Sequence, residues 1–178
     1  AVQGLEAAGL PAGSALIKIN NRKLLNGLMA TAGVTDEAQK LAVLRAVDKL
    51  DRLGAEGVRL LLGEGRLDES GAFTKGAGLN ARAADRVLAF TAAGVGGRSE
   101  TLAKLADVVG GSAEGDEGLA ELAAIDAALT ALGVGPDRAI VDPSVVRGLE
   151  YYTGAVFEAE LLLATTDDKG QKVTFGSI

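Results

Sequence analysis

Two adjacent tyrosines and a nearby arginine are the residues whose types and spacing best fit the binding of a substrate. Tyr151 and Tyr152 are the chain's two tyrosines, and Arg147 precedes Tyr151 by four residues. Arginine is a fixed cation with five donors, and each buried tyrosine hydroxyl needs a hydrogen-bond partner. Such a set suits a concave site that binds a carboxylate or phosphate beside a flat polar ring. The alternative is a β-strand with two packing aromatics and a surface arginine, since most aromatic pairs belong to a core.

Composition limits the other chemistry that the chain can perform. Its 178 residues include no cysteine and no histidine. This excludes disulfides, thiolate chemistry, Ser–His nucleophile pairs and histidine-based metal sites, and we predict no metal site. The net charge of −6 predicts weak binding of RNA by this chain alone, because phosphate neutralisation supplies most of such affinity.

Nothing in the sequence indicates a membrane protein. No apolar run reaches the roughly 18 residues that span a bilayer, and the residues from Ala1 to Glu6 lack the features of a signal peptide. We therefore expect a cytoplasmic protein with no membrane partner.

The surrounding pattern predicts an α+β fold, in which a helical lobe is inserted into an antiparallel sheet. Strands are predicted over 16–20, 139–141 and 153–163, followed by a hairpin loop over 165–171 and a return strand from 172. Helices are predicted up to residue 10, over 23–32, over 80–93 and over 119–132.

The helical lobe is predicted from two further apolar stripes. Thr35 would cap a helix that buries Leu41, Leu44, Val47, Leu50 and Leu53, and Ser99 would cap one that buries Leu102, Leu105 and Val109. The glycine-rich stretch 54–78 holds an apolar run at 58–62 that fits a short helix or a buried strand equally well. Residues 63–70 read as a loop whose acids would repel phosphate, and 110–118 as a flexible connector.

The run from Arg147 to Glu158, Arg-Gly-Leu-Glu-Tyr-Tyr-Thr-Gly-Ala-Val-Phe-Glu, resembles the histidine-binding motif of histidyl-tRNA synthetases, which are class II enzymes. The run from Ile17 to Leu25 resembles the strand-to-helix step that follows the second class II motif of that family. The resemblance implies three segments: 1–34 and 115–178 in the class II catalytic domain, and 35–114 as the helical insertion domain. In the family this insertion lies against the acceptor arm of the tRNA.

The resemblance also implies residue roles. Arg147 matches the catalytic arginine, which contacts the histidine carboxylate and the α-phosphate of ATP. Tyr152 matches the tyrosine that lines the imidazole pocket, and Tyr151 belongs to the same histidine-binding motif and packs behind the site. Glu150 stands where the family more often has aspartate. The implied substrates are histidine, ATP with Mg²⁺, and tRNA(His), and the implied assembly of the full-length enzyme is a homodimer.

Several parts of the family pattern do not occur in this sequence. The first two class II motifs are expected upstream of Ala1, and the third motif and the anticodon-binding domain downstream. We therefore expect an internal fragment of a synthetase that is inactive and binds no cofactor by itself. The main alternative is the non-catalytic, synthetase-like regulatory subunit of ATP phosphoribosyltransferase. A third interpretation is an interaction module whose helical lobe packs against a partner.

Overall fold

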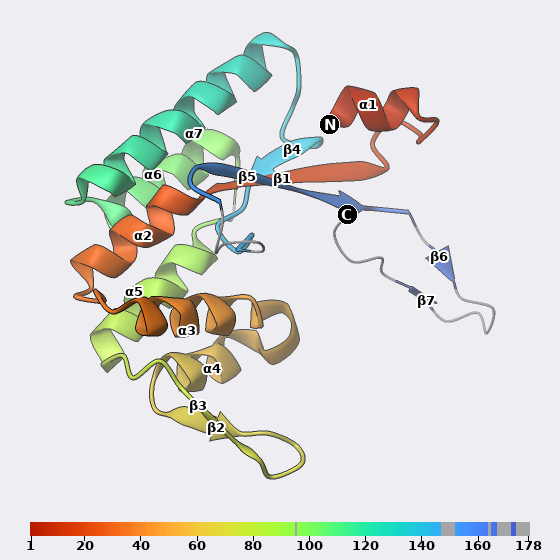
Figure 1. The fold of residues 1–178 in the computed structure, drawn as a ribbon. Helices are drawn as coiled ribbons and strands as arrows, with labels where there is room; N and C mark the ends of the chain where they lie inside the picture. The colour runs from red at the N-terminus through yellow and green to blue at the C-terminus, as the bar shows by residue number, and fades with distance from the viewer. Residues whose placement is uncertain (95, 147–151, 164, 167–171, 174–178) are drawn as a thin grey trace.

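The computed structural model describes residues 1–94, 96–146, 152–163, 165–166 and 172–173 (Figure 1). The helices, in chain order, are α1 (Val2–Ala7), α2 (Arg22–Thr31), α3 (Glu37–Val47), α4 (Leu50–Leu62), α5 (Ala81–Ala92), α6 (Arg98–Val109) and α7 (Ala113–Ala131). The strands are β1 (Ala15–Asn21), β2 (Gly65–Leu67), β3 (Phe73–Lys75), β4 (Ala139–Val141), β5 (Ala155–Leu161), β6 (Thr165–Thr166) and β7 (Lys172–Val173). The predicted α+β fold is confirmed.

Strand β1 is the middle strand of a three-stranded sheet with the order β4-β1-β5. The β1–β5 pair is antiparallel, as predicted, and the β1–β4 pair is parallel, so the sheet is mixed. The other described strands form two small antiparallel hairpins, β2–β3 and β6–β7. The predicted return strand from residue 172 is confirmed by β7, but residues 165–166, predicted as part of the hairpin loop, form its partner strand β6. The rest of the predicted loop, 167–171, lies outside the described residues.

The two faces of this sheet differ in polarity. Residues directly opposite each other in an antiparallel pair point to the same face, and successive residues alternate between faces. Lys18 lies opposite Glu158, and Asn20 lies opposite Val156, so this face carries charged and amide groups. The other face carries Ile17 and Ile19, both buried. On that side α7 contacts β1, and α6 contacts β4 (Figure 1).

Helices α2 and α7 lie unusually close together, because glycines face each other at their contact. A Cβ atom added at Gly27 of α2 would lie 2.7 Å from the Cα of Gly115 on α7. A Cβ added at Gly118 would lie 3.0 Å from the Cβ of Lys23. The prediction of a flexible connector over 110–118 is therefore wrong beyond residue 112. These glycines permit close packing of helices, and Ser112 caps α7 by accepting a hydrogen bond from the Gly115 amide.

The predicted apolar stripe from Leu41 to Leu53 is divided between two helices. α3 ends at Val47 and α4 begins at Leu50, and α3 buries Val43, Leu44, Ala46 and Val47. Apolar residues at steps of three drift by about 60° per step around a helix of 3.6 residues per turn, so one straight helix cannot bury the whole stripe. The break at residues 48–49 redirects the chain.

Three local predictions need correction, and one open choice is resolved. Asp36, rather than Thr35, caps α3, and α6 begins after Gly97 with no side-chain cap from Ser99. The predicted loop 63–70 contains strand β2 of the β2–β3 hairpin. The apolar run 58–62, left open between helix and strand, is helical and ends α4.

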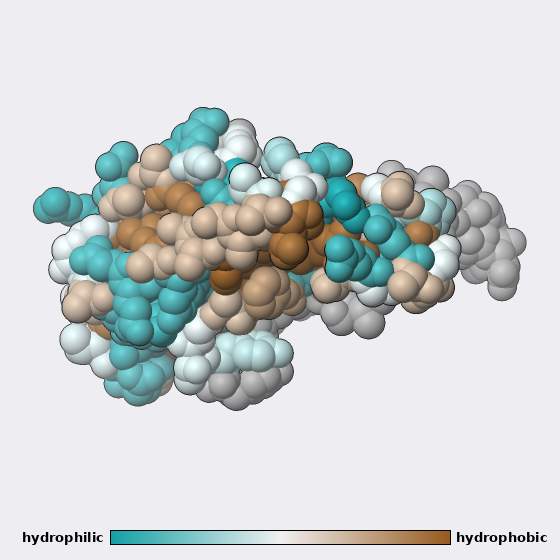
Figure 2. Space-filling model, turned by 90° about the horizontal axis from the view of Figure 1, so that it is seen from above, coloured by the Kyte–Doolittle hydropathy of each residue, from teal (hydrophilic) through white to brown (hydrophobic). Residues whose placement is uncertain are grey.

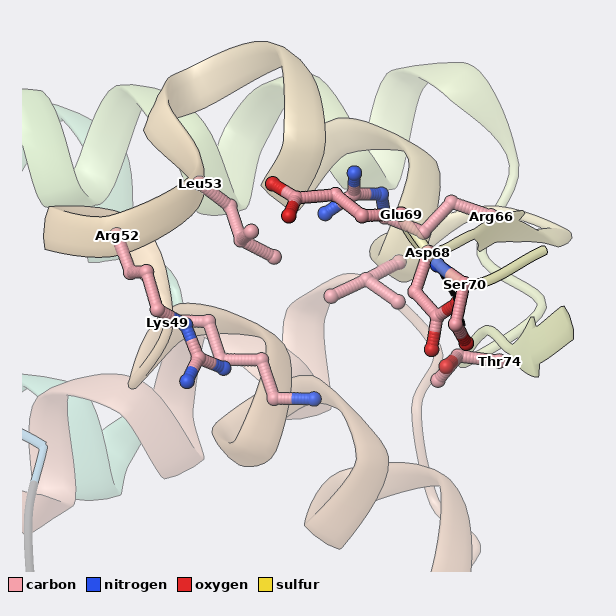
Figure 3. A pocket seen from close by; sticks show the side chains of 9 residues that line it. Lys49, Arg52, Leu53, Arg66, Asp68, Glu69, Ser70 and Thr74 are labelled. Carbon is pink, nitrogen blue, oxygen red and sulfur yellow. Dashed lines mark hydrogen bonds between the residues drawn. The ribbon is translucent and has the colours of Figure 1, made fainter. Parts of the chain in front are cut away.

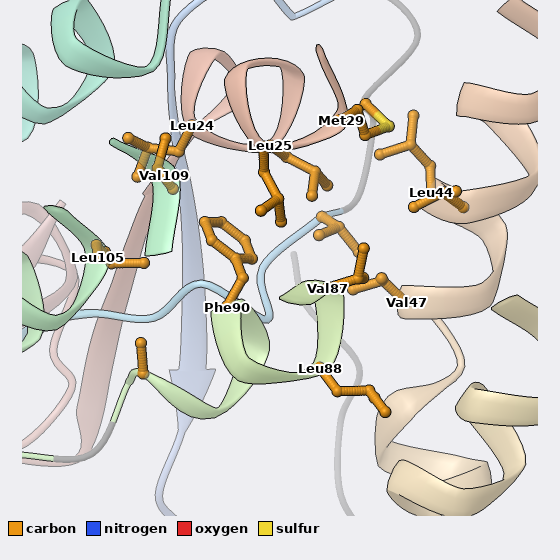
Figure 4. Packing of buried hydrophobic residues seen from close by; sticks show 14 of the residues in the cluster. Leu24, Leu25, Met29, Leu44, Val47, Val87, Leu88, Phe90, Leu105 and Val109 are labelled. Carbon is orange, nitrogen blue, oxygen red and sulfur yellow. The ribbon is translucent and has the colours of Figure 1, made fainter. Parts of the chain in front are cut away.

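Buried side chains of the helices form one cluster with those of the sheet. In Figure 4, Phe90 of α5 and Leu25 of α2 point toward each other, with Val87 beside them. Met29 of α2 lies near Leu44 of α3 in the same view. The described residues between 35 and 114 therefore share a core with α2. The predicted division into 1–34, 35–114 and 115–178 stays a prediction, and its second boundary falls in the first turn of α7.

Apolar side chains also reach the surface. Seen from above, a band of apolar surface crosses the middle of the molecule between hydrophilic patches (Figure 2). Large exposed apolar side chains among the described residues are Leu60, Leu67, Phe73, Leu132, Tyr152, Phe157, Leu162 and Leu163. None of the described helices is long and apolar enough to cross a bilayer.

Candidate functional site

The predicted site residues precede β5 in the sequence. Arg147 and Tyr151 lie outside the described residues, which stop at Val146 and resume at Tyr152. Tyr152 is 47% exposed and lies three residues before β5. The structure therefore places one of the three predicted side chains, and it describes the chain on both sides of the other two.

The junction between β1 and α2 contacts the chain on both sides of this segment. The side-chain amide of Asn20 donates hydrogen bonds to the carbonyl oxygens of Pro143, at 3.1 Å, and Val145, at 3.0 Å. The backbone amide of Arg22 donates to the carbonyl oxygen of Gly154, at 2.9 Å. Asn20 near the end of β1 thus holds the chain before the segment, and Arg22 at the start of α2 holds the chain after it.

Asp142 shapes the turn that leads into the segment. Its backbone amide donates to the Ile19 carbonyl at 2.8 Å, which continues the contact between β4 and β1. Its Oδ1 accepts hydrogen bonds from the backbone amide of Ser144, at 3.0 Å, and from the Ser144 hydroxyl, at 2.6 Å. This local pattern is typical of aspartate in turns.

Lys18 lies between two carboxylates on the polar face of the sheet. Its Nζ is 3.0 Å from Glu160 and 3.4 Å from Asp142. Partial burial disfavours the charged amine, but the hydrogen bond to Glu160 and the charges of Asp142 and Glu160 outweigh it and raise the pKa of Lys18. A hollow of about 30 Å³ adjoins Lys18 and Val146. The described residues here place an amine between two carboxylates on the polar face of the sheet.

A second ionic cluster ties α7 to the same junction from the other face. Glu121 accepts from the Asn21 amide at 2.6 Å and from Lys23 Nζ at 2.5 Å, and Lys23 also contacts Glu117 at 2.8 Å. The hydrogen bonds from Lys23 and Asn21 lower the pKa of Glu121. This cluster fixes the direction in which α2 leaves the sheet.

Arg22 is a residue that sequence reasoning did not single out. Its Nη1 is buried and has no hydrogen-bond partner among the described residues. Burial lowers the pKa of Arg22, and the charges of Glu114 and Glu37 oppose the shift. The polar residues of β1, Lys18 and Asn20, were missed as well. The available signal was that Lys18 interrupts the apolar run from Leu16 to Ile19 and that Asn20 follows this run directly, because a buried lysine or asparagine needs a partner.

A separate cleft of about 500 Å³ lies between α4 and the β2–β3 hairpin (Figure 3). Lys49 and Arg52 approach it from the start of α4, and Arg66 and Thr74 line its hairpin side. Asp68 is held by its own turn, accepting from Ser70 and from the Ala72 amide. Across the described parts of the chain, no hydrogen bond or ion pair engages the charged groups of Lys49, Arg52 and Arg66. The charge of Arg66 contributes to the lowered pKa of Asp68, after the hydrogen bonds that Asp68 accepts from Ser70 and Ala72. The cleft therefore combines three cations with two carboxylates, those of Asp68 and Glu69.

No group of three or more metal-ligating side chains occurs in the described ranges. The candidate regions are thus two: the polar face of the sheet at the start of β5, and the basic cleft beside α4.

Comparison with known proteins agrees with the resemblance of the motif. The family model described as histidyl-tRNA synthetase matches residues 1–161. The chain belongs to the histidyl-tRNA synthetase family. Histidine–tRNA ligase of Caulobacter vibrioides is 73% identical over 179 residues, which cover 100% of this chain and 36% of that protein. The Brucella suis ligase is 56% identical over 177 residues, covering 98% of this chain and 35% of the ligase. The chain thus spans about a third of the length of these relatives.

Solved structures of the histidyl-tRNA synthetase family share the fold. The crystal structure of histidyl-tRNA synthetase from Nostoc sp. PCC 7120 matches with a TM-score of 0.71 at 28% identity, over 89% of this chain and 34% of that one. A Bacillus halodurans protein titled as an ATP phosphoribosyltransferase regulatory subunit/histidyl-tRNA synthetase matches with a TM-score of 0.66 at 21% identity, over 89% of this chain and 36% of that one. The second match bears on the fold alone.

Proposed function

We propose that this chain is the middle part of a histidine–tRNA ligase. The ligase activates histidine with ATP to form histidyl-adenylate and transfers the histidyl group to tRNA(His). The observation that carries the proposal is the 73% identity to the Caulobacter vibrioides ligase over the whole chain. This identity, with the intact Arg147 and Tyr151–Tyr152 motif, favours the ligase over the regulatory subunit of ATP phosphoribosyltransferase.

Adenylate formation brings a carboxylate to a polyanionic nucleotide, so it requires positive charge near the reacting oxygens. In the proposed mechanism Arg147 is the catalytic residue and contacts both the histidine carboxylate and the α-phosphate of ATP. A planar guanidinium can donate to two oxygens at once as charge moves onto the phosphate. The carboxylate oxygen attacks the α-phosphorus, and pyrophosphate leaves.

Tyr152, with Tyr151 behind it, would recognise the imidazole ring. A hydroxyl that pairs with a ring nitrogen discriminates against apolar side chains of similar size, because they would leave the site's polar group unpaired. On the polar face of the sheet nearby, the ammonium group of Lys18 lies between the carboxylates of Asp142 and Glu160. Mg²⁺ would arrive with ATP, and we assign it no ligand among the described residues.

We also propose that the basic cleft beside α4 contacts the tRNA. Its support is that Lys49, Arg52 and Arg66 line one concavity, in which they outnumber the carboxylates of Asp68 and Glu69. Phosphate contacts by lysine and arginine supply affinity without reading sequence. The enzyme is expected to be a cytoplasmic homodimer at full length.

The activity test is histidine-dependent exchange of pyrophosphate into ATP by the full-length protein. Exchange with histidine, and none with other amino acids, is the expected result. A full-length protein that shows no exchange but stimulates ATP phosphoribosyltransferase would favour the regulatory subunit instead.

The cleft is tested by charge reversal in the full-length enzyme. The Lys49→Glu/Arg52→Glu variant should raise KM for tRNA(His) by roughly tenfold or more, and the slope of log affinity against log salt should fall by about one to two. Arg82→Glu/Lys104→Glu, two reversals on the exposed surfaces of α5 and α6, is the control with the same change in net charge. Equal effects of the two variants would mean that net charge, and not the cleft, governs tRNA binding.

A further inference from the structure

The side chain of Asn20 is fully engaged inside the protein. Asn20 is 2% exposed, and its Nδ2 donates to the carbonyls of Pro143 and Val145. Its Oδ1 accepts from the Asn21 backbone amide at 2.8 Å. A primary amide has two donor hydrogens, and here each has a partner. Asn20 therefore has no donor left for a substrate, and whatever it does for the site it does through residues 143–145.

These hydrogen bonds reach across a long stretch of sequence to a particular place. Val145 lies 125 residues after Asn20 and two residues before Arg147. On the other side of the segment the contact is made by backbone atoms, from the Arg22 amide to the Gly154 carbonyl. A substitution that removes the Asn20 amide can therefore detach the chain before the segment. The contact after the segment joins backbone atoms and does not depend on a side chain.

Asn20 is also suited to this task by its chemistry. Its hydrogens meet two carbonyl oxygens of one turn, so they fix both the position and the tilt of that turn. Aspartate has the same shape but would set an oxygen against those carbonyls. Asp142 supports the same turn through Ser144, so without Asn20 the turn should keep its shape but lose its attachment to β1.

We propose that Asn20 is a positioning residue for adenylate formation: it anchors the turn 143–145 to β1 and thereby fixes the chain directly before the histidine-binding motif. This inference rests on the proposed ligase function. A shift of the arginine by about 1 Å is enough to slow such a reaction by up to roughly 100-fold, because the transition state is held by oriented donors.

The experiment compares three variants of the full-length enzyme. Asn20→Ala removes both anchoring hydrogen bonds, and Asn20→Asp keeps the shape but reverses the polarity. Asn21→Ala is the matched control, since this buried neighbour caps α2 and contacts Glu121, and its side chain makes no described contact with residues 143–145. The readouts are single-turnover adenylate formation, the histidine KM, the thermal midpoint and the rate of trypsin cleavage after Arg147.

The expected result is a split between the two positions. Asn20→Ala should slow adenylate formation by about tenfold or more and accelerate cleavage after Arg147, and Asn20→Asp should do both more strongly. Asn21→Ala should lower the thermal midpoint at least as much with adenylation within about threefold of wild type. In an Arg147→Lys background the Asn20→Ala effect should shrink, because both changes disturb the same contact.

Contrary outcomes are distinct. Equal loss of activity in Asn20→Ala and Asn21→Ala, or an undiminished Asn20→Ala effect in the Arg147→Lys background, overturns the positioning role. Wild-type enzyme without histidine-dependent exchange overturns the proposed function and, with it, this inference. Asn20→Ser, which keeps a smaller donor, replaces Asn20→Ala in every comparison if the alanine variant does not fold.

Discussion

Arg147 and Tyr152 would contribute to the proposed reaction at different moments. Arg147→Lys keeps the charge but loses the planar fork, so it should slow adenylate formation far more than it weakens histidine binding. Tyr152→Phe should mainly weaken histidine binding, by about 1–3 kcal/mol, because it leaves an imidazole nitrogen without a partner. Pre-steady-state kinetics with a histidine titration separates the two effects. Arg138→Lys, at an arginine that pairs with Glu6, is the control. Equal small losses in both site variants would mean that Arg147 and Tyr152 stabilise the sheet and do not take part in the reaction.

Lys18 gives a prediction about pH. Its pKa is raised above the ordinary 10.5, so the folded state holds this proton more tightly than the unfolded state. The stabilisation is complete below the unfolded pKa and is lost as the pH rises through the folded pKa. Unfolding midpoints measured from pH 8 to 12 should therefore fall more steeply in wild type than in Lys18→Met. Parallel curves would show that the contacts with Glu160 and Asp142 do not stabilise the fold.

At the scale of single residues, the sequence predicted the histidine-binding motif but not the side chains that hold the neighbouring chain in place. The types and order of Arg147, Tyr151 and Tyr152 indicate chemistry without any knowledge of the fold. The polar residues of β1, Lys18 and Asn20, indicate at most that each needs a partner. Their partners at residues 142–145 are brought near only by the pairing of β1 with β4. Contacts between residues so distant in sequence cannot be read from local spacing.

The contact of α2 with α7 is the element-scale feature most sensitive to a single atom. Gly27→Ala places a methyl group 2.7 Å from a backbone carbon, so we expect a loss of about 1–3 kcal/mol in the free energy of unfolding. Gly4→Ala, in a helix with nothing within 4 Å of the added Cβ, should instead stabilise by up to about 1 kcal/mol. Chemical denaturation of both variants measures the difference. If Gly27→Ala is neutral, the two helices can move apart without cost.

Most helices and strands were predictable, and the exceptions have physical causes. The periodic stripe over 119–132 and the apolar strands at β1, β4 and β5 follow from local pattern. Glycine was misread over 110–118, because the same residue serves flexible loops and close helix contacts. The break after Val47 was missed because spacing by three residues resembles a helical face over short distances.

For the whole molecule, a prediction concerns the 178-residue chain by itself. It should form no histidyl-adenylate at a useful rate, because the resemblance places the ATP-binding arginine of the second class II motif outside this sequence and catalysis depends on charges that are already in place. Histidine-dependent ATP–pyrophosphate exchange measures this directly, with the full-length ligase as positive control. Clear exchange by the isolated chain would show that its own residues suffice for activation.

The central position of β1 has a consequence for biosynthesis. Its two neighbours in the sheet, β4 and β5, lie far downstream in the sequence. The Asn20 side-chain amide can form its hydrogen bond to Val145 only after another 125 residues have been synthesised. At about 5–20 residues per second, a ribosome needs roughly 6–25 s to make that stretch. During that time β1 emerges with its hydrogen-bonding edges unpaired, while the local helices α2 to α6 can already form. Nascent chains halted before β4 should therefore be the ones that bind chaperones and aggregate.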